Sequence, residues 1–308
     1  MKEDLLNQFC SVLGSDNVMM DEPMSKHTTF RVGGPADFYL NPHSTEELKR
    51  ALCICKEENI PYFIIGNGSN LLVSDEGYRG VVIQIYRNMS ETEVQGETKI
   101  RAKAGALLSA VAKTALNHSL TGMEFASGIP GTIGGAVVMN AGAYGGEMKD
   151  ILEEVTVLTK DGEVKTLAAS ELELGYRTSI VMKEGYIVLE AVLKLEKGDA
   201  PKIGHRMNEL KEQRVSKQPL EFPSAGSTFK RPEGNFAGKL IMDAGLAGYQ
   251  VGGAQISAKH CGFVINAGGA AAGDVYRLIR QVQKIVYDKF QVKLETEVKM
   301  LGVFKDGE

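Results

Sequence analysis

One stretch of the sequence, residues 127–147, limits what the chain can fold into. It contains seven glycines among small apolar residues: Gly128, Gly131, Gly134, Gly135, Gly142, Gly145 and Gly146. Glycine loses more backbone entropy on folding than other residues and brings no side chain to a core, so we expect neither a good helix nor core packing here. Bare backbone N–H groups suit an anion or a flat polar cofactor. A set of tight turns in a β-rich fold is the alternative interpretation.

Length and charge exclude several classes of protein. A chain of 308 residues suggests two or three domains. The net charge is −4, from 35 basic and 39 acidic residues, and no block of like charge occurs. Binding to nucleic acid or to a membrane surface is therefore not predicted. The first residues carry acids, unlike a secretory signal, and no apolar run is long enough to span a bilayer, so we expect a cytoplasmic protein.

Cysteine and histidine spacings do not indicate a metal site. Cys10, Cys53, Cys55 and Cys261 form neither a C-x-x-C pair nor a zinc pattern. The five histidines are scattered, and no H-E-x-x-H motif occurs. We therefore expect a reducing compartment and no structural metal.

Another glycine loop, which comes before the glycine stretch in the chain and is therefore the first of the two, follows a short apolar strand. A helix that opens at Ser44-Thr-Glu-Glu47 is followed by the strand Tyr62–Ile65, the loop Gly66-Asn-Gly-Ser-Asn70 and a further strand over residues 71–73. A β-α-β unit would place this loop at the end of a buried strand, where α/β folds hold ligands. The loop is not a dinucleotide fingerprint, because Leu71 stands where the third glycine belongs and a strand follows.

Other patterns predict the remaining elements. Two strands are expected on either side of a Gly33-Gly34-Pro35 turn, and Asp161-Gly162 predicts a hairpin. Apolar residues at i, i+3, i+4 spacing between Val275 and Val286 predict an amphipathic helix. A final strand is expected over residues 292–304. The charged and proline-containing segment 197–201 predicts the main domain boundary near residue 197.

Seven motifs together resemble the UDP-N-acetylenolpyruvoylglucosamine reductases, flavoenzymes of bacterial cell-wall synthesis. They occur in the family's order over almost the whole chain. The motifs are Arg31-Val-Gly-Gly-Pro-Ala-Asp37, Gly66-Asn-Gly-Ser-Asn-Leu-Leu72, Gly128-Ile-Pro-Gly-Thr-Ile-Gly-Gly135, Asn140-Ala-Gly-Ala-Tyr-Gly145, Tyr176-Arg-Thr178, Gly226-Ser-Thr-Phe-Lys230 and Leu294-Glu-Thr-Glu-Val298.

The resemblance implies an α+β fold. Two α+β subdomains of the vanillyl-alcohol-oxidase/PCMH type, residues 1–75 and 76–197, would bind FAD, and a smaller C-terminal α+β domain, residues 198–308, would bind the substrate. It also implies non-covalent FAD, NADPH as electron donor, a UDP-sugar substrate, UDP-N-acetylmuramate as product and a monomeric protein. The short interval between Arg177 and Ser227 resembles the compact subtype, which lacks a substrate-capping tyrosine loop.

The family match assigns the two glycine loops to FAD. The expected cofactor-binding residues are Ile65, Gly66, Asn67, Gly68, Ser69, Asn70, Leu71, Gly128, Gly131, Thr132, Gly134, Gly135, Ala136, Asn140, Ala141 and Gly142.

Three further residues fit the chemistry that the resemblance implies. Hydride addition to the terminal carbon of an enolpyruvyl ether leaves carbanion character beside the carboxylate, which needs stabilisation and a proton donor. By resemblance, Ser227 donates the proton, Arg177 grips the carboxylate and Glu297 stabilises the intermediate. Taken alone, Ser227 would be a turn residue, Arg177 a surface arginine and Glu297 part of a solvated strand face.

The two phosphates of a UDP-sugar call for cations in the substrate-binding part. The candidates by position are Arg214, Lys230 and Arg231, with Tyr144 and His260 as weaker ones. Lys230 and Arg231 are also close enough in sequence to stabilise a Ser227 alkoxide. A solvated basic surface is the alternative interpretation of these cations.

Two other functions stay open at this point. One is a different oxidoreductase of the same fold with non-covalent FAD. Many enzymes of this fold attach FAD covalently through a histidine, and no histidine lies in either glycine loop. Flavin that stays on the denatured polypeptide would therefore argue against the reductase interpretation. The other is a UDP-sugar-binding protein without catalysis, against which the joint presence of Arg177, Ser227 and Glu297 argues.

Overall fold

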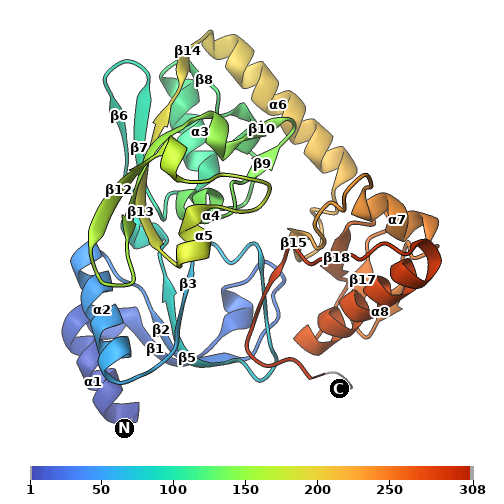
Figure 1. The fold of residues 1–308 in the computed structure, drawn as a ribbon, viewed down its shortest axis with the longest axis horizontal. Coiled ribbons are helices and arrows are strands. Elements are labelled where there is room, and N and C mark those ends of the chain that lie inside the picture. Colours follow the sequence, from blue (N-terminus) through green and yellow to red (C-terminus); the bar gives the residue numbers. More distant parts are fainter. Residues whose placement is uncertain (1, 306–308) are drawn as a thin grey trace. The chain divides into compact units, whose positions relative to one another are not determined.

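The computed structural model describes residues 2–305, which form two compact units (Figure 1). Unit 1 is built from the described residues of Met1–Met19, Leu40–Asn67 and Val82–Arg214. Unit 2 is built from those of Met20–Tyr39, Gly68–Val81 and Val215–Glu308. The chain therefore passes from one unit to the other inside the loop Gly66–Asn70, between Asn67 and Gly68.

Two helices and a four-stranded sheet begin the chain. Helix α1 (Lys2–Leu13) buries Leu5 and Phe9, and α2 (Thr45–Glu57) starts at Ser44, whose side chain accepts a hydrogen bond from the Glu47 amide at 3.1 Å. This confirms the predicted helix start. The sheet has the order β1-β2-β5-β3. Its strands are β1 (Val18–Pro23), β2 (Pro35–Leu40), β5 (Tyr78–Gln84) and β3 (Tyr62–Ile65).

An antiparallel five-stranded sheet of order β12-β11-β13-β7-β6 lies beside the helices of unit 1 (Figure 1). Its strands are β6 (Thr92–Gln95), β7 (Lys99–Lys103), β11 (Leu152–Leu158), β12 (Val164–Ala168) and β13 (Ile187–Lys194). The hairpin β11–β12 turns through Asp161-Gly162, as predicted, with Gly162 at φ 83°.

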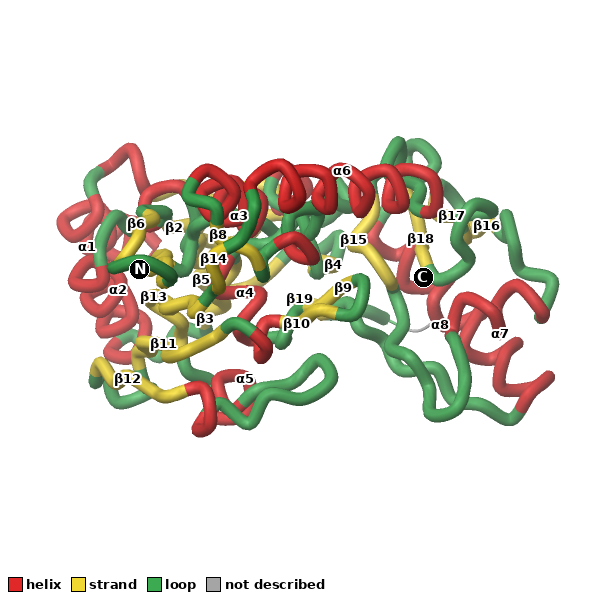
Figure 2. The backbone as a smooth tube through the Cα atoms, turned by 90° about the horizontal axis from the view of Figure 1, so that it is seen from above, coloured by secondary structure: helices red, strands yellow, loops and turns green. Residues whose placement is uncertain are grey.

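Four helices and two short strand pairs complete unit 1. The helices are α3 (Leu108–Asn117), α4 (Ile133–Val138), α5 (Ile180–Glu184) and α6 (Ala200–Lys217), which crosses into unit 2 near its end and is the continuous helix along the top of Figure 2. The strand pairs are β8 (Leu120–Thr121) with β14 (Glu196–Lys197), and β9 (Gly142–Ala143) with β10 (Gly146–Glu147).

Unit 2 contains a four-stranded sheet of order β15-β18-β17-β16 and two helices. The strands are β15 (Ser224–Ser227), β16 (Gln250–Val251), β17 (Ala254–Ile256) and β18 (Phe263–Asn266), and the helices are α7 (Ala237–Asp243) and α8 (Ala272–Phe290). As predicted, α8 is amphipathic: Val275, Leu278, Ile279, Val282 and Val286 are fully buried. In the same unit, β4 (Leu71–Val73) pairs in parallel with β19 (Lys299–Leu301).

Three sequence-based expectations about secondary structure were wrong. Of the two strands expected around Gly33-Gly34-Pro35, only the second, β2, is present. Residues 24–32 form no strand: Met24–Lys26 is a 3-10 helix, and a Cβ on Gly34 would lie 2.0 Å from the Asp75 carbonyl oxygen, so close packing sets this segment. Of residues 292–304, only β19 is a strand. The glycine stretch contains the short helix α4, because tertiary burial of Ile133 and Val137 outweighs the low helix propensity of glycine.

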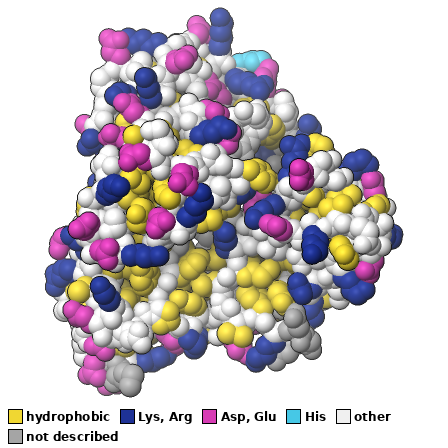
Figure 3. Space-filling view, in the orientation of Figure 1, with side chains coloured by type: hydrophobic (Ala, Val, Ile, Leu, Met, Phe, Trp, Pro, Cys, Tyr) yellow, Lys and Arg dark blue, Asp and Glu magenta, His cyan; other side chains and the backbone are white. Residues whose placement is uncertain are grey.

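Charged side chains of both signs are interspersed on the face drawn in Figure 3. Within residues 2–305, no helix combines the length and apolar character needed to cross a membrane. Nor do His, Cys, Asp and Glu side chains of that part of the chain gather in groups of three that could hold a metal ion.

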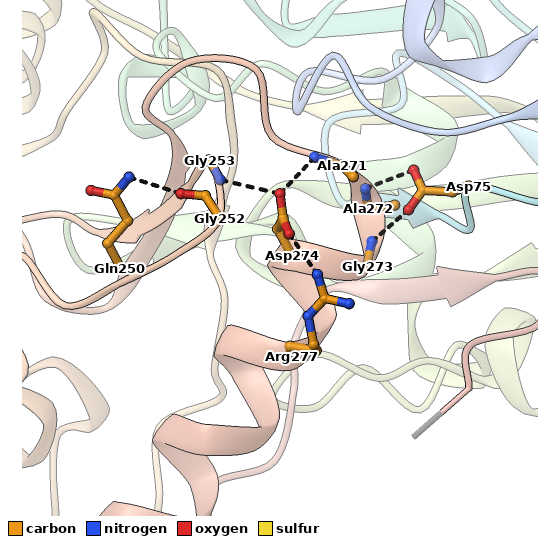
Figure 4. Close-up of polar contacts among 9 residues, drawn as sticks. All are labelled: Asp75, Gln250, Gly252, Gly253, Ala271, Ala272, Gly273, Asp274 and Arg277. Carbon is orange, nitrogen blue, oxygen red and sulfur yellow. Dashed lines mark hydrogen bonds and ion pairs between the residues drawn. The ribbon is translucent and has the colours of Figure 1, made fainter. Parts of the chain in front are cut away.

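The start of α8 depends on a carboxylate from a distant segment (Figure 4). Asp75 accepts hydrogen bonds from the Ala272 and Gly273 amides at 2.8 and 2.7 Å, and Asp274 accepts one from the Ala271 amide at 3.1 Å. Both carboxylates thus satisfy amides that the helix itself leaves unpaired.

We predict that Asp75→Ala lowers the free energy of unfolding by about 1–2 kcal/mol, because it leaves these helix amides without their charged acceptor. Asp288→Ala is the control, since Asp288 is exposed in the last turn of α8 and pairs with Lys284, which is exposed as well. We expect a change below about 0.5 kcal/mol for the control in denaturant unfolding. Equal effects of the two substitutions would contradict this role of Asp75.

Candidate active site

The two glycine loops meet inside unit 1. A Cβ on Gly66 would lie 2.4 Å from the Oγ1 atom of Thr132, so only glycine allows this approach. The Asn67 amide donates a hydrogen bond to the Pro130 carbonyl at 2.8 Å, and the Gln84 amide donates one to the Gly66 carbonyl at 2.9 Å. Residues far apart in sequence therefore form one continuous glycine-rich surface.

Adjacent glycines in the second loop serve different purposes. Gly134 is buried, and a Cβ there would lie 3.1 Å from the Cβ of Ala104, so a larger residue would have to push Ala104 aside. Gly135 is exposed, and its Cβ would meet nothing nearer than 3.7 Å; the same nearest distance holds for Gly131. Packing within the protein therefore does not explain why residues 131 and 135 are glycine. Open space on their side is what a bound flat cofactor would fill, so these residues fit such a group.

Asn140 positions the turn that carries Arg177. Asn140 is fully buried, and its amide donates hydrogen bonds to Glu147 Oε2 at 2.7 Å and to the Gly175 carbonyl at 3.1 Å. Its Oδ1 atom accepts one from the Lys149 amide at 2.9 Å. The side chain of Asn140, expected at the cofactor, is thus used within the protein.

Arg177 lies at the tip of a two-residue turn. Reciprocal backbone hydrogen bonds of 3.1 and 3.3 Å between Gly175 and Thr178 close the turn, and Arg177 has φ 55°. A left-handed conformation is uncommon for arginine, and the anchored turn enforces it. The guanidinium lies over the exposed ring of Tyr176, 5.1 Å from its centroid.

Arg214, expected at the substrate, packs against the glycine stretch of unit 1. Its Cδ atom is 3.2 Å from where a Cβ on Gly128 would be. Burial lowers the pKa of the Arg214 guanidinium, and the nearby Tyr144 phenol acts in the opposite direction. No carboxylate within residues 2–305 forms an ion pair with Arg214. A partly buried cation in this position favours an anionic or electron-rich ligand beside Gly128.

Ser227 is the last residue of the short strand β15 of unit 2. Gly226, at φ 73°, lies in a β-bulge that interrupts the pairing of β15 with β18, and Ser227 is exposed. The next residue, Thr228, is fully buried; its amide donates to the Gly262 carbonyl at 2.9 Å, and its hydroxyl accepts from the Val264 amide at 3.0 Å. The Ser227 hydroxyl therefore projects from a well-anchored backbone.

The backbone of Glu297 is bonded on both sides. Its amide donates to the Thr228 carbonyl at 2.8 Å, and its carbonyl accepts from the Asn70 side chain at 3.2 Å. The structure thus brings Glu297 beside the residue that follows Ser227 and beside the end of the first glycine loop. Sequence separation of 227 residues between Asn70 and Glu297 hid this contact.

The remaining substrate candidates of unit 2 are engaged with neighbours. The Lys230 ammonium pairs with Glu295 at 2.9 Å, and the Arg231 guanidinium lies 3.9 Å from the centroid of the Phe236 ring. His260 Nδ1 accepts a hydrogen bond from the Gly262 amide at 3.1 Å, and burial lowers the pKa of the imidazole. A neutral imidazole at neutral pH suits hydrogen bonding better than charge neutralisation.

The other expected cofactor residues line or support the two loops. Ile65, Gly68, Leu71 and Ala136 are buried, whereas Ser69, Ala141 and Gly142 are partly accessible. Gly68 has φ 61°, and a Cβ there would lie 1.9 Å from the His27 carbonyl oxygen, so its conformation and packing both require glycine.

Comparison with known proteins identifies the class first. The model of an FAD-binding domain matches residues 36–168, and the model of the C-terminal domain of UDP-N-acetylenolpyruvoylglucosamine reductase matches residues 218–301. With the mixed α+β architecture, these matches define an FAD-dependent oxidoreductase with a separate C-terminal domain, which confirms the expected fold class and cofactor.

Whole-chain comparisons identify the family. The chain is 55% identical to the UDP-N-acetylenolpyruvoylglucosamine reductase of Agathobacter rectalis, over 99% of this chain and 100% of that protein. It is 55% identical to that of Alkaliphilus oremlandii, over 94% and 95% of the two chains. The crystal structure of the Thermus caldophilus reductase superposes with a TM-score of 0.79 at 38% identity, covering 92% of this chain and 98% of that one. The chain belongs to the UDP-N-acetylenolpyruvoylglucosamine reductase family.

We predict opposite effects of alanine at the two adjacent glycines. Gly135→Ala should leave the apoprotein as stable as wild type or raise its free energy of unfolding by up to about 1 kcal/mol, because alanine favours helix. The same variant should retain FAD poorly, because the new methyl group occupies the open side. Gly134→Ala should instead destabilise the apoprotein by about 1–3 kcal/mol through overpacking against Ala104.

Denaturant unfolding of the apoproteins and the flavin-to-protein absorbance ratio after gel filtration measure the two effects. Full flavin content in Gly135→Ala would show that this face of the loop is not where the cofactor lies.

Proposed function

We propose that the protein reduces the enolpyruvyl ether of UDP-N-acetylenolpyruvoylglucosamine to UDP-N-acetylmuramate, with FAD as hydride carrier and NADPH as electron donor. The observation that best supports this activity is the anchoring of Ser227 and Glu297 on one hydrogen-bonded backbone in unit 2. A protein that only binds a UDP-sugar has no need for a proton donor and an acid held in this way. The names of the relatives supply the substrate.

The proposed reaction adds a hydride and a proton across one carbon–carbon double bond. Reduced FAD would supply the hydride to the terminal carbon of the enolpyruvyl group. The carbon that bears the ether oxygen and the carboxylate then carries excess electron density, and Ser227 Oγ gives it a proton. The electron pair of the hydride forms the new bond at the terminal carbon, the π electron pair of the double bond forms the new bond to the proton, and the serine is restored by a proton from solvent.

Arg177 and Glu297 would stabilise the electron-rich state. The planar guanidinium of Arg177 can bind a carboxylate through two parallel hydrogen bonds, which stabilises the enolic form of the substrate. Glu297 in its protonated state can donate a hydrogen bond to the same electron-rich group. Arg214 would place its charge beside the cofactor at Gly128.

The proposal also includes the roles of the domains, the cellular compartment and the oligomeric state. We assign FAD binding to residues 1–75 and 76–197 and substrate binding to residues 198–308, in a cytoplasmic monomer. All four cysteines are free, which agrees with a reducing compartment.

The proposed activity predicts two separable colour changes in the anaerobic FAD-loaded protein. NADPH should bleach the flavin absorbance, and UDP-N-acetylenolpyruvoylglucosamine should then restore it with formation of one product molecule per flavin. Stopped-flow absorbance with product analysis measures both steps. Bleaching that the enolpyruvyl sugar fails to reverse would rule out this substrate.

Ser227→Ala should affect only the second step. We expect flavin reduction by NADPH within about twofold of wild type and product formation slowed by about 10²–10⁴-fold, because only the second step needs the proton. Ser224→Ala, at the other end of β15, is the matched control and should leave both steps unchanged. Equal loss of both steps in Ser227→Ala would remove Ser227 from the proton-donor role.

A further inference from the structure

We propose that Asn70 is a positioning residue for Glu297, a role that rests on the proposed function of Glu297. The residue belongs to the glycine loop Gly66–Asn70 and was expected to contact the cofactor. Its side-chain amide instead donates a hydrogen bond to the Glu297 carbonyl at 3.2 Å.

This hydrogen bond replaces a missing strand contact. Glu297 precedes β19 by two residues, so its carbonyl lies outside the β4–β19 ladder. Asn70 precedes β4 by one residue, and its own carbonyl accepts a hydrogen bond from the Lys299 amide at 3.1 Å. The backbone of Asn70 therefore bonds to Lys299 and its side chain bonds to Glu297. The side chain thus continues the hydrogen-bonded pairing of the two segments as far as Glu297.

The opposite side of the same peptide is already fixed. The Glu297 amide is bonded to the Thr228 carbonyl, and Phe229 forms an isolated bridge with Thr296. With Asn70 on one side and Thr228 on the other, the peptide groups on both sides of the Glu297 Cα are held. A held backbone fixes the direction in which the Glu297 side chain leaves its Cα and limits the rotamers by which the carboxyl group can reach the side of Ser227.

Other hydrogen bonds near Asn70 should keep the fold intact when its side chain is removed. Ser74 donates its hydroxyl to the Val303 carbonyl at 2.6 Å, and its amide donates to the Leu301 carbonyl at 2.9 Å. Asp75 holds the first amides of α8 (Figure 4). These contacts and the β4–β19 ladder do not involve the Asn70 amide, so its removal should disturb residues 296–298 locally.

The experiment compares Asn70→Ala, Asn70→Asp and Ser74→Ala. Ser74→Ala is the matched control, because it removes another side-chain hydrogen bond between the same two segments without touching Glu297. For each variant we would measure flavin content, the rate of flavin reduction by NADPH, the rate of reoxidation by UDP-N-acetylenolpyruvoylglucosamine, and hydrogen exchange of the peptide over residues 292–301 in the apoprotein.

We expect Asn70→Ala to slow reoxidation by about 10–100-fold, as a misplaced catalytic group does. Flavin content and reduction by NADPH should stay within about twofold, and exchange in residues 292–301 should be faster. Ser74→Ala should show wild-type rates in both steps. Asn70→Asp should show the same defect at pH 8 and recover toward the wild-type rate as the pH falls, because only a protonated aspartate can donate to the Glu297 carbonyl. Asn70→Ala has no such group and should not recover.

Loss of flavin, or equal slowing of both steps, would overturn the proposal and return Asn70 to the cofactor-binding residues. Wild-type reoxidation rates in Asn70→Ala would overturn it as well. If wild-type protein itself is not reoxidised by the enolpyruvyl sugar, the proposed function fails. The exchange measurement still decides in that case whether Asn70 holds the Glu297 segment.

Discussion

The approach of Gly66 to Thr132 is the contact on which the arrangement of the cofactor loops depends. No side chain heavier than hydrogen fits at Gly66, since a Cβ would lie 2.4 Å from the threonine hydroxyl. The same threonine caps α4, whose first turn contains Gly134 and Gly135. A single close approach therefore joins the end of β3 to the start of α4.

The first glycine loop also carries the chain into unit 2. Beyond Gly68, it continues into β4, which pairs with β19, and the side chain of Asn70 extends this pairing to Glu297. The segment that we propose to bind the flavin is thus hydrogen-bonded to the residue that we propose to act on the substrate. Gly68 itself is confined by the His27 carbonyl and by a left-handed φ, which leaves little freedom at the point where the chain changes units.

Local patterns in the sequence predicted the elements that depend on local physics. The cap at Ser44, the Asp161-Gly162 turn and the apolar face of α8 each follow from residues within one or two turns of one another, and the structure confirms them. Of the two strands expected around Gly33-Gly34-Pro35, the second formed as β2. The first did not form, because close packing of Gly34 against Asp75 decides the conformation of that segment. The helix α4 was missed for the same reason, since burial of Ile133 and Val137 is a tertiary effect.

In the candidate site, too, the contacts between distant segments could not be predicted from the sequence. Family resemblance named Arg177, Ser227 and Glu297, and their roles stay proposals. No pattern in the sequence could show that the Asn140 side chain bonds to Gly175 in the turn that carries Arg177, or that the Asn70 side chain bonds to Glu297. Both contacts join segments that are distant in sequence. Nor could it separate Gly134 from Gly135, which have the same side chain and opposite surroundings.

Hydrogen exchange of the unmodified protein with and without FAD tests the central claim most directly, namely that the backbone of both glycine loops forms the cofactor surface. We predict slower exchange on FAD binding in the peptides over residues 66–71 and 128–136 together. Protection confined to one loop, or absent from both while the flavin stays bound, would contradict it.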